Sequence, residues 1–157
     1  MSGLNYSIQQ ATPEDFLKVA ALDRIAWPEE PDVFIPDGEH AWRLWCEHAL
    51  VLAAKLSSGE ARDSGNVIGA LLMFPTVQGE CFLHKIMVHP EARGSGVGTA
   101  LMREGLARAT TMTLLTVNPQ NTAAVKLYQN FGFEIRELVK GYYRPHEDRY
   151  VMQYTPK

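Results

Sequence analysis

The chain has 157 residues, of which 46% are hydrophobic and 21% charged, and its formal net charge is −3 at pH 7. This length and balance predict a single globular domain spanning residues 1–157. A slightly acidic chain without a basic block does not favour nucleic-acid binding, and no apolar run approaches the roughly 20 residues of a membrane span.

The cysteine content and the N-terminal residues indicate the cellular compartment in which the protein is expected. Cys46 and Cys81 are the two cysteines, and they have neither metal-ligand spacing nor the number needed for a disulfide framework. No basic segment followed by an apolar one appears at the N-terminus. We therefore expect no metal, no membrane partner and a cytoplasmic location.

The first half of the chain is expected to form a strand, two helices and a hairpin. Thr12 reads as a helix cap, because Pro13 and two acids follow it in the first turn. Residues 27–38 are rich in proline and acids and read as a loop. The other expected elements are a strand at 6–10, a helix at 39–48 and hairpin strands at 49–56 and 67–74.

The second half alternates strands with helices. Apolar periodicity predicts the helices, and short apolar runs predict the strands. The expected elements are strands at 80–88, 112–117, 133–139 and 149–154, and helices at 96–110 and 121–131. Together with the first half, this order describes an α/β protein with a mixed sheet and helices packed on it.

A glycine-rich turn between the strand at 80–88 and the following helix carries the first functional signal. It contains Gly94, Gly96 and Gly98, which let consecutive backbone N–H groups converge on an anion. The helix N-terminus adds unpaired donors and a positive dipole end. This turn suits a diphosphate, and Arg93 or Arg103 could add positive charge; a flexible turn without a ligand is the alternative.

Two motifs identify the diphosphate. A dinucleotide fingerprint would need glycine where Thr99 stands, and no nucleoside triphosphate loop is present. The turn matches R-x-x-G-x-G from Arg93 to Gly98, and residues 118–133 supply N-x-x-N followed by a helix and L-Y-x-x-x-G-F. From about residue 80 onward the chain therefore resembles the GCN5-related N-acetyltransferase (GNAT) family, and residues 1–79 match it in element order.

The resemblance implies a fold, a co-substrate and a set of binding residues. The fold is a mixed, mostly antiparallel sheet of six to seven strands with about four helices, in which strands 4 and 5 splay around the coenzyme. The co-substrate is acetyl-CoA, and homodimers are common in the family. The residues implied in coenzyme binding are Ile86, Met87, Val88, Arg93, Gly94, Ser95, Gly96, Val97, Gly98, Thr99, Asn121 and Tyr128.

The resemblance also implies a proton donor. Tyr128 corresponds to the tyrosine whose hydroxyl faces the thioester sulfur, although its place on an apolar helical stripe also fits a core aromatic. Asn121 fits a helix cap as well as a coenzyme contact, and Gly132 fits a helix stop. Asn118 is expected to form a loop first.

The general base is harder to assign. Thr116 occupies the position of a catalytic glutamate in ribosomal-protein N-terminal acetyltransferases and cannot accept the proton. His84 is the preferred base, because its position resembles a catalytic histidine of the family and histidine titrates near neutrality. Glu80, an ordered water and a non-catalytic, hydrogen-bonded His84 are the alternatives. The other histidines, His40, His48, His89 and His146, are expected on the surface or in loops.

The acceptor is expected to be a primary amine. Glu29 and Glu30 lie in an acidic loop that either attracts a cationic amine or is simply solvated. Tyr142 and Tyr143 lie in a tail similar to the closing hairpin of acetyltransferases acting on protein N-termini. A peptide or protein N-terminus, a lysine and a small cationic amine remain the alternatives. The competing function is a non-catalytic acyl-CoA-binding module, and a dinucleotide-binding protein is third.

Overall fold

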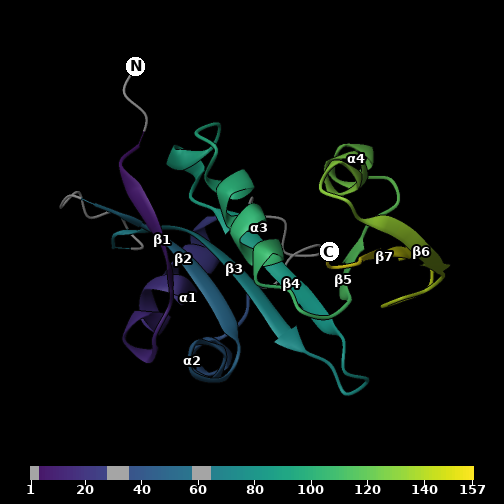
Figure 1. Cartoon of the computed structure of the whole chain (residues 1–157), viewed down its shortest axis with the longest axis horizontal. Coiled ribbons are helices and arrows are strands. Elements are labelled where there is room, and N and C mark those ends of the chain that lie inside the picture. Colours follow the sequence, from purple (N-terminus) through teal and green to yellow (C-terminus); the bar gives the residue numbers. More distant parts are fainter. Residues whose placement is uncertain (1–3, 28–35, 58–64) are drawn as a thin grey trace. The chain divides into compact units, whose positions relative to one another are not determined.

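The computed structural model describes residues 4–27, 36–57 and 65–157 (Figure 1). In these ranges the strands are β1 (Tyr6–Gln10), β2 (Leu50–Leu56), β3 (Val67–Pro75), β4 (Cys81–Val88), β5 (Thr113–Val117), β6 (Glu134–Val139) and β7 (Arg149–Tyr154). The helices are α1 (Phe16–Ile25), α2 (Glu39–His48), α3 (Val97–Ala107) and α4 (Thr122–Asn130), with short 3-10 turns at Pro13–Asp15 and Pro90–Ala92.

The strands form one sheet in the order β1-β2-β3-β4-β5-β7-β6. The β1–β2, β2–β3, β5–β7 and β6–β7 pairs are antiparallel, and β4 runs parallel to β5. Among the described residues this is a seven-stranded mixed sheet with four α-helices, which confirms the fold class expected from the sequence.

The chain divides into two compact units, one containing residues up to 74 together with 84–107 and the other containing 75–83 and 108–157. In the first unit, β3 is buried on both faces because helices cover each of them (Figure 1). Ala70 and Leu72 join the core that α1 and α2 complete. On the other face, a Cβ added to Gly69 would lie 2.8 Å from Val97 and 3.0 Å from Leu101, so glycine lets α3 pack directly on β3.

Helix α1 begins close to its expected start. The backbone N–H of Thr12 donates to the Asp15 carboxylate at 2.9 Å, and Pro13–Asp15 forms a 3-10 turn before the α-helix proper. The buried face of α1 consists of Val19, Ala20, Leu22 and Asp23. A charged residue on this apolar face was not expected.

The second unit is built on the antiparallel β5–β7–β6 ladder. The first two residues of β4 add to it, since Cys81 pairs with Thr113 and Phe82 with Leu114. Helix α4 begins at its Asn121 cap and ends before Gly132, whose φ of 107° is left-handed, as expected for a helix-stop glycine.

Two details differ from the sequence-based expectation. Helix α3 ends at Ala107, three residues before its expected end. The predicted apolar stripe of α4 is not buried, and Leu127 is 49% exposed. In the described part of the chain, none of the helices is both long and apolar enough to span a membrane.

Candidate active site

The glycine-rich turn that follows β4 has the geometry of an anion site. Gly94 and Gly96 have φ values of 80° and 84°, a region that residues with a Cβ rarely adopt. A Cβ at either position would meet nothing within 4 Å, so there is room for a ligand against the backbone. The N–H of Ala100 bonds to the carbonyl of Gly96 at 3.0 Å, which starts the α3 ladder. The preceding N–H groups of the first turn therefore have no intrahelical acceptor and suit a phosphate.

Two residues next to the turn, His89 and Arg93, form hydrogen bonds that hold it in place. The side chain of His89 is buried, with 5% of the residue exposed, and its Nδ1 accepts a hydrogen bond from the backbone N–H of Glu91 at 3.1 Å. The backbone N–H of His89 donates to the carbonyl of Ile68 at 2.8 Å. His89 is thus a loop residue, as expected, but a buried one. The guanidinium of Arg93 donates to the carbonyl of Ala26 at the end of α1. Arg93 therefore anchors the turn to α1 with its side chain, a role that the sequence did not indicate.

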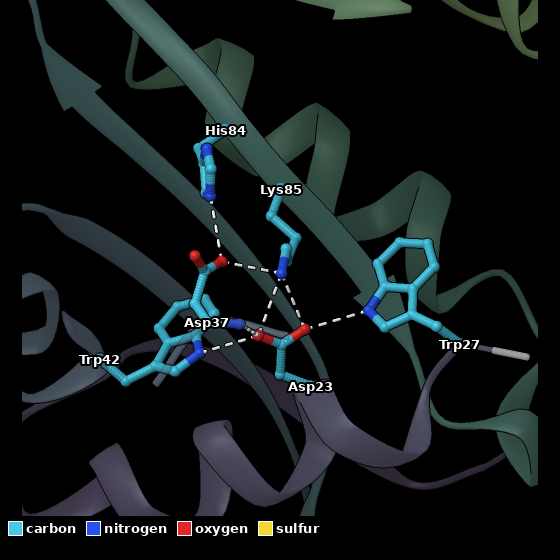
Figure 2. Close-up of polar contacts among 6 residues, drawn as sticks. All are labelled: Asp23, Trp27, Asp37, Trp42, His84 and Lys85. Carbon is cyan, nitrogen blue, oxygen red and sulfur yellow. Dashed lines mark hydrogen bonds and ion pairs between the residues drawn. The ribbon is translucent and has the colours of Figure 1, made fainter. Parts of the chain in front are cut away.

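A cluster of charged residues lies between β4, α1 and the segment before α2 (Figure 2). At its centre, Asp23 has no exposed surface. The Lys85 ammonium donates to both Asp23 oxygens, at 2.8 and 3.0 Å. The indole N–H groups of Trp27 and Trp42 each donate to Asp23 at 3.0 Å, and the backbone N–H of Asp37 donates at 2.8 Å. Five donated bonds offset the cost of burying this carboxylate.

Asp37 connects the buried pair to His84. Its Oδ2 lies 2.8 Å from Lys85 Nζ and 3.1 Å from His84 Nε2. Burial alone would raise the pKa of Asp37, but the bonds from His84 and Lys85 outweigh it and lower the pKa to about 2. Asp37 is therefore a carboxylate, and so an acceptor, at neutral pH.

Two aromatic rings lie close to His84. The ring centroid of Trp45 lies 5.2 Å from that of His84, and the centroid of Phe74 lies 6.1 Å away. The His84 side chain keeps 34% of its surface exposed. This placement fits both a proton acceptor and the alternative of a half-buried, hydrogen-bonded histidine.

Asp23 and Lys85 were missed by sequence reasoning. Their contact joins residues 62 positions apart, so the pair becomes visible only when β4 lies beside α1. The available signal was a charge at an apolar position in each element: Asp23 beside Leu22 on the buried face of α1, and Lys85 between Leu83 and Met87 in β4.

In the second unit, Tyr128 lies on α4. Its ring packs edge-on against Phe133 at 6.0 Å, and burial raises the pKa of the Tyr128 hydroxyl. The phenol is therefore protonated at neutral pH and can act as a donor. Asn121 caps α4 by accepting a bond from the N–H of Ala124 at 3.2 Å, as expected. Asn118 accepts one from the N–H of Gln120 at 3.0 Å, which fits its expected loop role.

The structure also describes Glu80, the alternative base, and two of the four residues expected to bind the acceptor substrate. Glu80 forms an ion pair with Arg136 at 3.2 Å, which makes it less available as a base than an unpaired carboxylate. Tyr142 and Tyr143 are 38% and 57% exposed, and their ring centroids lie 4.9 Å apart. Glu29 and Glu30 lie outside the described residues.

The described ranges 4–27, 36–57 and 65–157 hold no group of three or more histidine, cysteine or carboxylate side chains that could bind a metal. Within the charged cluster, the Lys85 ammonium already supplies the cation between Asp23 and Asp37.

These features define an α/β protein with an open, glycine-rich turn of left-handed conformation between a sheet strand and a helix. The family model of the acetyltransferase (GNAT) family matches residues 19–133, and the chain belongs to that family. This confirms the resemblance and the class of acetyltransferase expected from the two sequence motifs.

Relatives and solved structures agree with this assignment. An uncharacterized N-acetyltransferase of Methanocaldococcus jannaschii is 38% identical over 66 residues, a match that covers 40% of this chain and only 29% of that protein. An N-alpha-acetyltransferase of Sulfurisphaera tokodaii is 24% identical over 166 residues, covering 96% of this chain and 93% of that protein. The ribosomal-protein-S18-alanine N-acetyltransferase of Escherichia coli has a similar fold, with a TM-score of 0.77 and 20% identity over 97% of this chain and 94% of that one.

Proposed function

We propose that the protein is an acetyl-CoA-dependent N-acetyltransferase whose acceptor is the α-amine of a peptide or protein. The observation that carries the proposal is the open, left-handed Gly94–Gly96 turn at the N-terminus of α3, in a chain of the GNAT family. The acceptor is supported by the N-alpha-acetyltransferase of Sulfurisphaera tokodaii, which is similar over 96% of this chain. Lysine side chains and small cationic amines are the competing acceptors.

Coenzyme binding would rest mainly on backbone groups. The N–H groups of Gly94, Ser95, Gly96, Val97, Gly98 and Thr99 would hold the pyrophosphate. The backbones of Ile86, Met87 and Val88 would pair with the pantetheine arm. This is supported by the β4–β5 ladder, which in the described chain includes only the first two residues of β4. Asn121 would add a contact from its cap position.

The reaction needs a neutral amine, a stabilised carbonyl oxygen and a protonated leaving group. When bound, acetyl-CoA supplies an activated acetyl thioester. His84 would accept the proton of the acceptor, because an α-ammonium group has a pKa of about 7.7–8.0 and cannot attack while charged. A backbone N–H near Met87 would bond to the developing oxyanion. Tyr128, protonated at neutral pH, would donate to the departing thiolate.

Acceptor recognition would use the exposed tyrosine pair and the acidic loop. Tyr142 and Tyr143, whose rings pack edge-on, would contact a peptide backbone. Glu29 and Glu30 would attract a cationic amine.

The test is an acceptor panel with purified protein. Thiol release from acetyl-CoA would be measured with peptides that have a free α-amine and blocked lysines, with peptides that have the reverse pattern, and with polyamines. Coenzyme binding would be followed in parallel by calorimetry. The proposal predicts turnover on the free α-amine. Tight binding without turnover on any amine would instead favour the non-catalytic module, and a lack of binding would contradict both.

A further inference from the structure

The Asp37–His84 contact determines which ring nitrogen of His84 carries a proton and which one can accept a proton. The Asp37 carboxylate can only accept hydrogen bonds, because it is ionised at neutral pH. The bond of 3.1 Å to His84 Nε2 therefore needs a proton on that nitrogen. In a neutral imidazole the other nitrogen, Nδ1, then carries the free lone pair.

We propose that Asp37 is a positioning residue that holds His84 through Nε2 and leaves Nδ1 as the atom that accepts the acceptor's proton. The proposal rests on the function proposed above and adds the orientation of its base. In the step, the N–H bond of the acceptor ammonium breaks, its electron pair stays on the amine, and the proton bonds to Nδ1. The resulting imidazolium keeps its Nε2–H donated to Asp37.

Asp37 is itself fixed at two points, which a positioning role requires. Its backbone N–H donates to Asp23 at 2.8 Å, and its Oδ2 lies 2.8 Å from the Lys85 ammonium (Figure 2). Asp23 in turn has no exposed surface. The carboxylate therefore presents one oxygen to His84 from a rigid support, while the Trp45 and Phe74 rings restrict the imidazole.

Charged and aromatic groups surround His84. In the described part of the chain, the charged groups that face His84 are Asp37 directly and, behind it, Lys85 and Asp23. Packed against the histidine, α2 presents Trp45 and β3 presents Phe74. Two carboxylates and one ammonium leave a single negative charge beside the imidazole.

Nitrogen-15 NMR of the wild-type protein tests the orientation without any variant. At a pH where His84 is neutral, we expect a protonated Nε2 and a bare Nδ1. A proton on Nδ1 would overturn the proposal. This measurement needs no substrate, so it stays informative even if no acceptor is ever acetylated.

Asp37→Ala tests the positioning role. We expect the NMR titration midpoint of His84 to fall, because the carboxylate that accepts its Nε2–H is lost. The acidic limb of the kcat/KM profile should fall by the same amount, with acetyl-CoA affinity unchanged. Glu47→Gln is the matched control, since it removes an α2 carboxylate that pairs with Arg43 and His48.

The outcomes separate this inference from the proposed function. An unmoved NMR midpoint in Asp37→Ala overturns the inference. A moved midpoint with an unmoved acidic limb shows that His84 is not the base, which also overturns it but leaves acetyl transfer standing. A wild-type protein that turns over no amine refutes the proposed function.

Discussion

The ammonium nitrogen of Lys85 lies 2.8 Å from Oδ1 of Asp23, and the Lys85 side chain is 9% exposed while that of Asp23 is fully buried. This ion pair links β4, the strand that leads into the glycine-rich turn, to α1. The same helix end also receives the Arg93 guanidinium at Ala26. The support of the candidate base and that of the candidate phosphate turn therefore meet on one helix.

Lys85→Met should destabilise the protein strongly. It removes the cation and leaves the Asp23 carboxylate buried without a countercharge, which costs about 3–5 kcal/mol in comparable sites. The measurement is the free energy of unfolding from urea titration. Lys18→Met is the control, because Lys18 is exposed and donates only to Asn66 at 3.2 Å among its described contacts. A loss below about 1 kcal/mol, the size typical of an exposed pair, would contradict this account of the cluster.

The acid sensitivity of the fold should depend on Asp37. Its pKa is about 2 in the folded protein against 3.8 for the unperturbed group, so its stabilisation is present above pH 3.8 and is lost as the pH falls through about 2. Asp37→Asn should remove on the order of 1–2 kcal/mol of pH-dependent stability from that window. Unfolding by urea at about pH 5 and about pH 2.5 measures it. The exposed Glu137→Gln serves as control, and an unchanged pH dependence in Asp37→Asn would refute the prediction.

Gly96→Ala should separate ligand binding from backbone strain. Gly96 and Gly79 have φ values of 84° and 81°, and a Cβ at either meets nothing within 4 Å. Both alanine variants should therefore lose a similar stability, about 1–2 kcal/mol. Only Gly96→Ala places a methyl group where the phosphates are proposed to lie, so it alone should weaken acetyl-CoA binding, by about tenfold or more in calorimetry. Equal coenzyme affinities in the two variants would place the phosphates elsewhere.

Tyr128→Phe should lower kcat with little change in coenzyme affinity. The variant keeps the ring contact with Phe133 and loses only the hydroxyl, whose donation to a leaving group is typically worth about 100-fold or more. Tyr154→Phe is the matched control, because its ring also packs on Phe133, at 5.6 Å. If both variants keep the wild-type kcat, Tyr128 is a packing residue, as its helical stripe also allowed.

The sequence contained most of the fold and only part of the site. Periodicity and turn residues placed the strands and helices that the structure describes, because these signals are local. The glycine-rich composition of the turn likewise marked Gly94 and Gly96, whose left-handed conformation glycine adopts readily. Local signals could not reveal the Asp23–Lys85 pair, the Asp37–His84 contact or the burial of His89, because each depends on residues that only the sheet and its helices bring together.

The most direct test of the central claim is an amide NMR titration of the nitrogen-15-labelled protein with acetyl-CoA. The account predicts that the largest shifts occur at the amides of residues 94–99, where the turn and the first turn of α3 would bind the pyrophosphate. If saturating coenzyme leaves those amides unmoved, the turn does not hold the phosphates and the proposed mechanism is wrong.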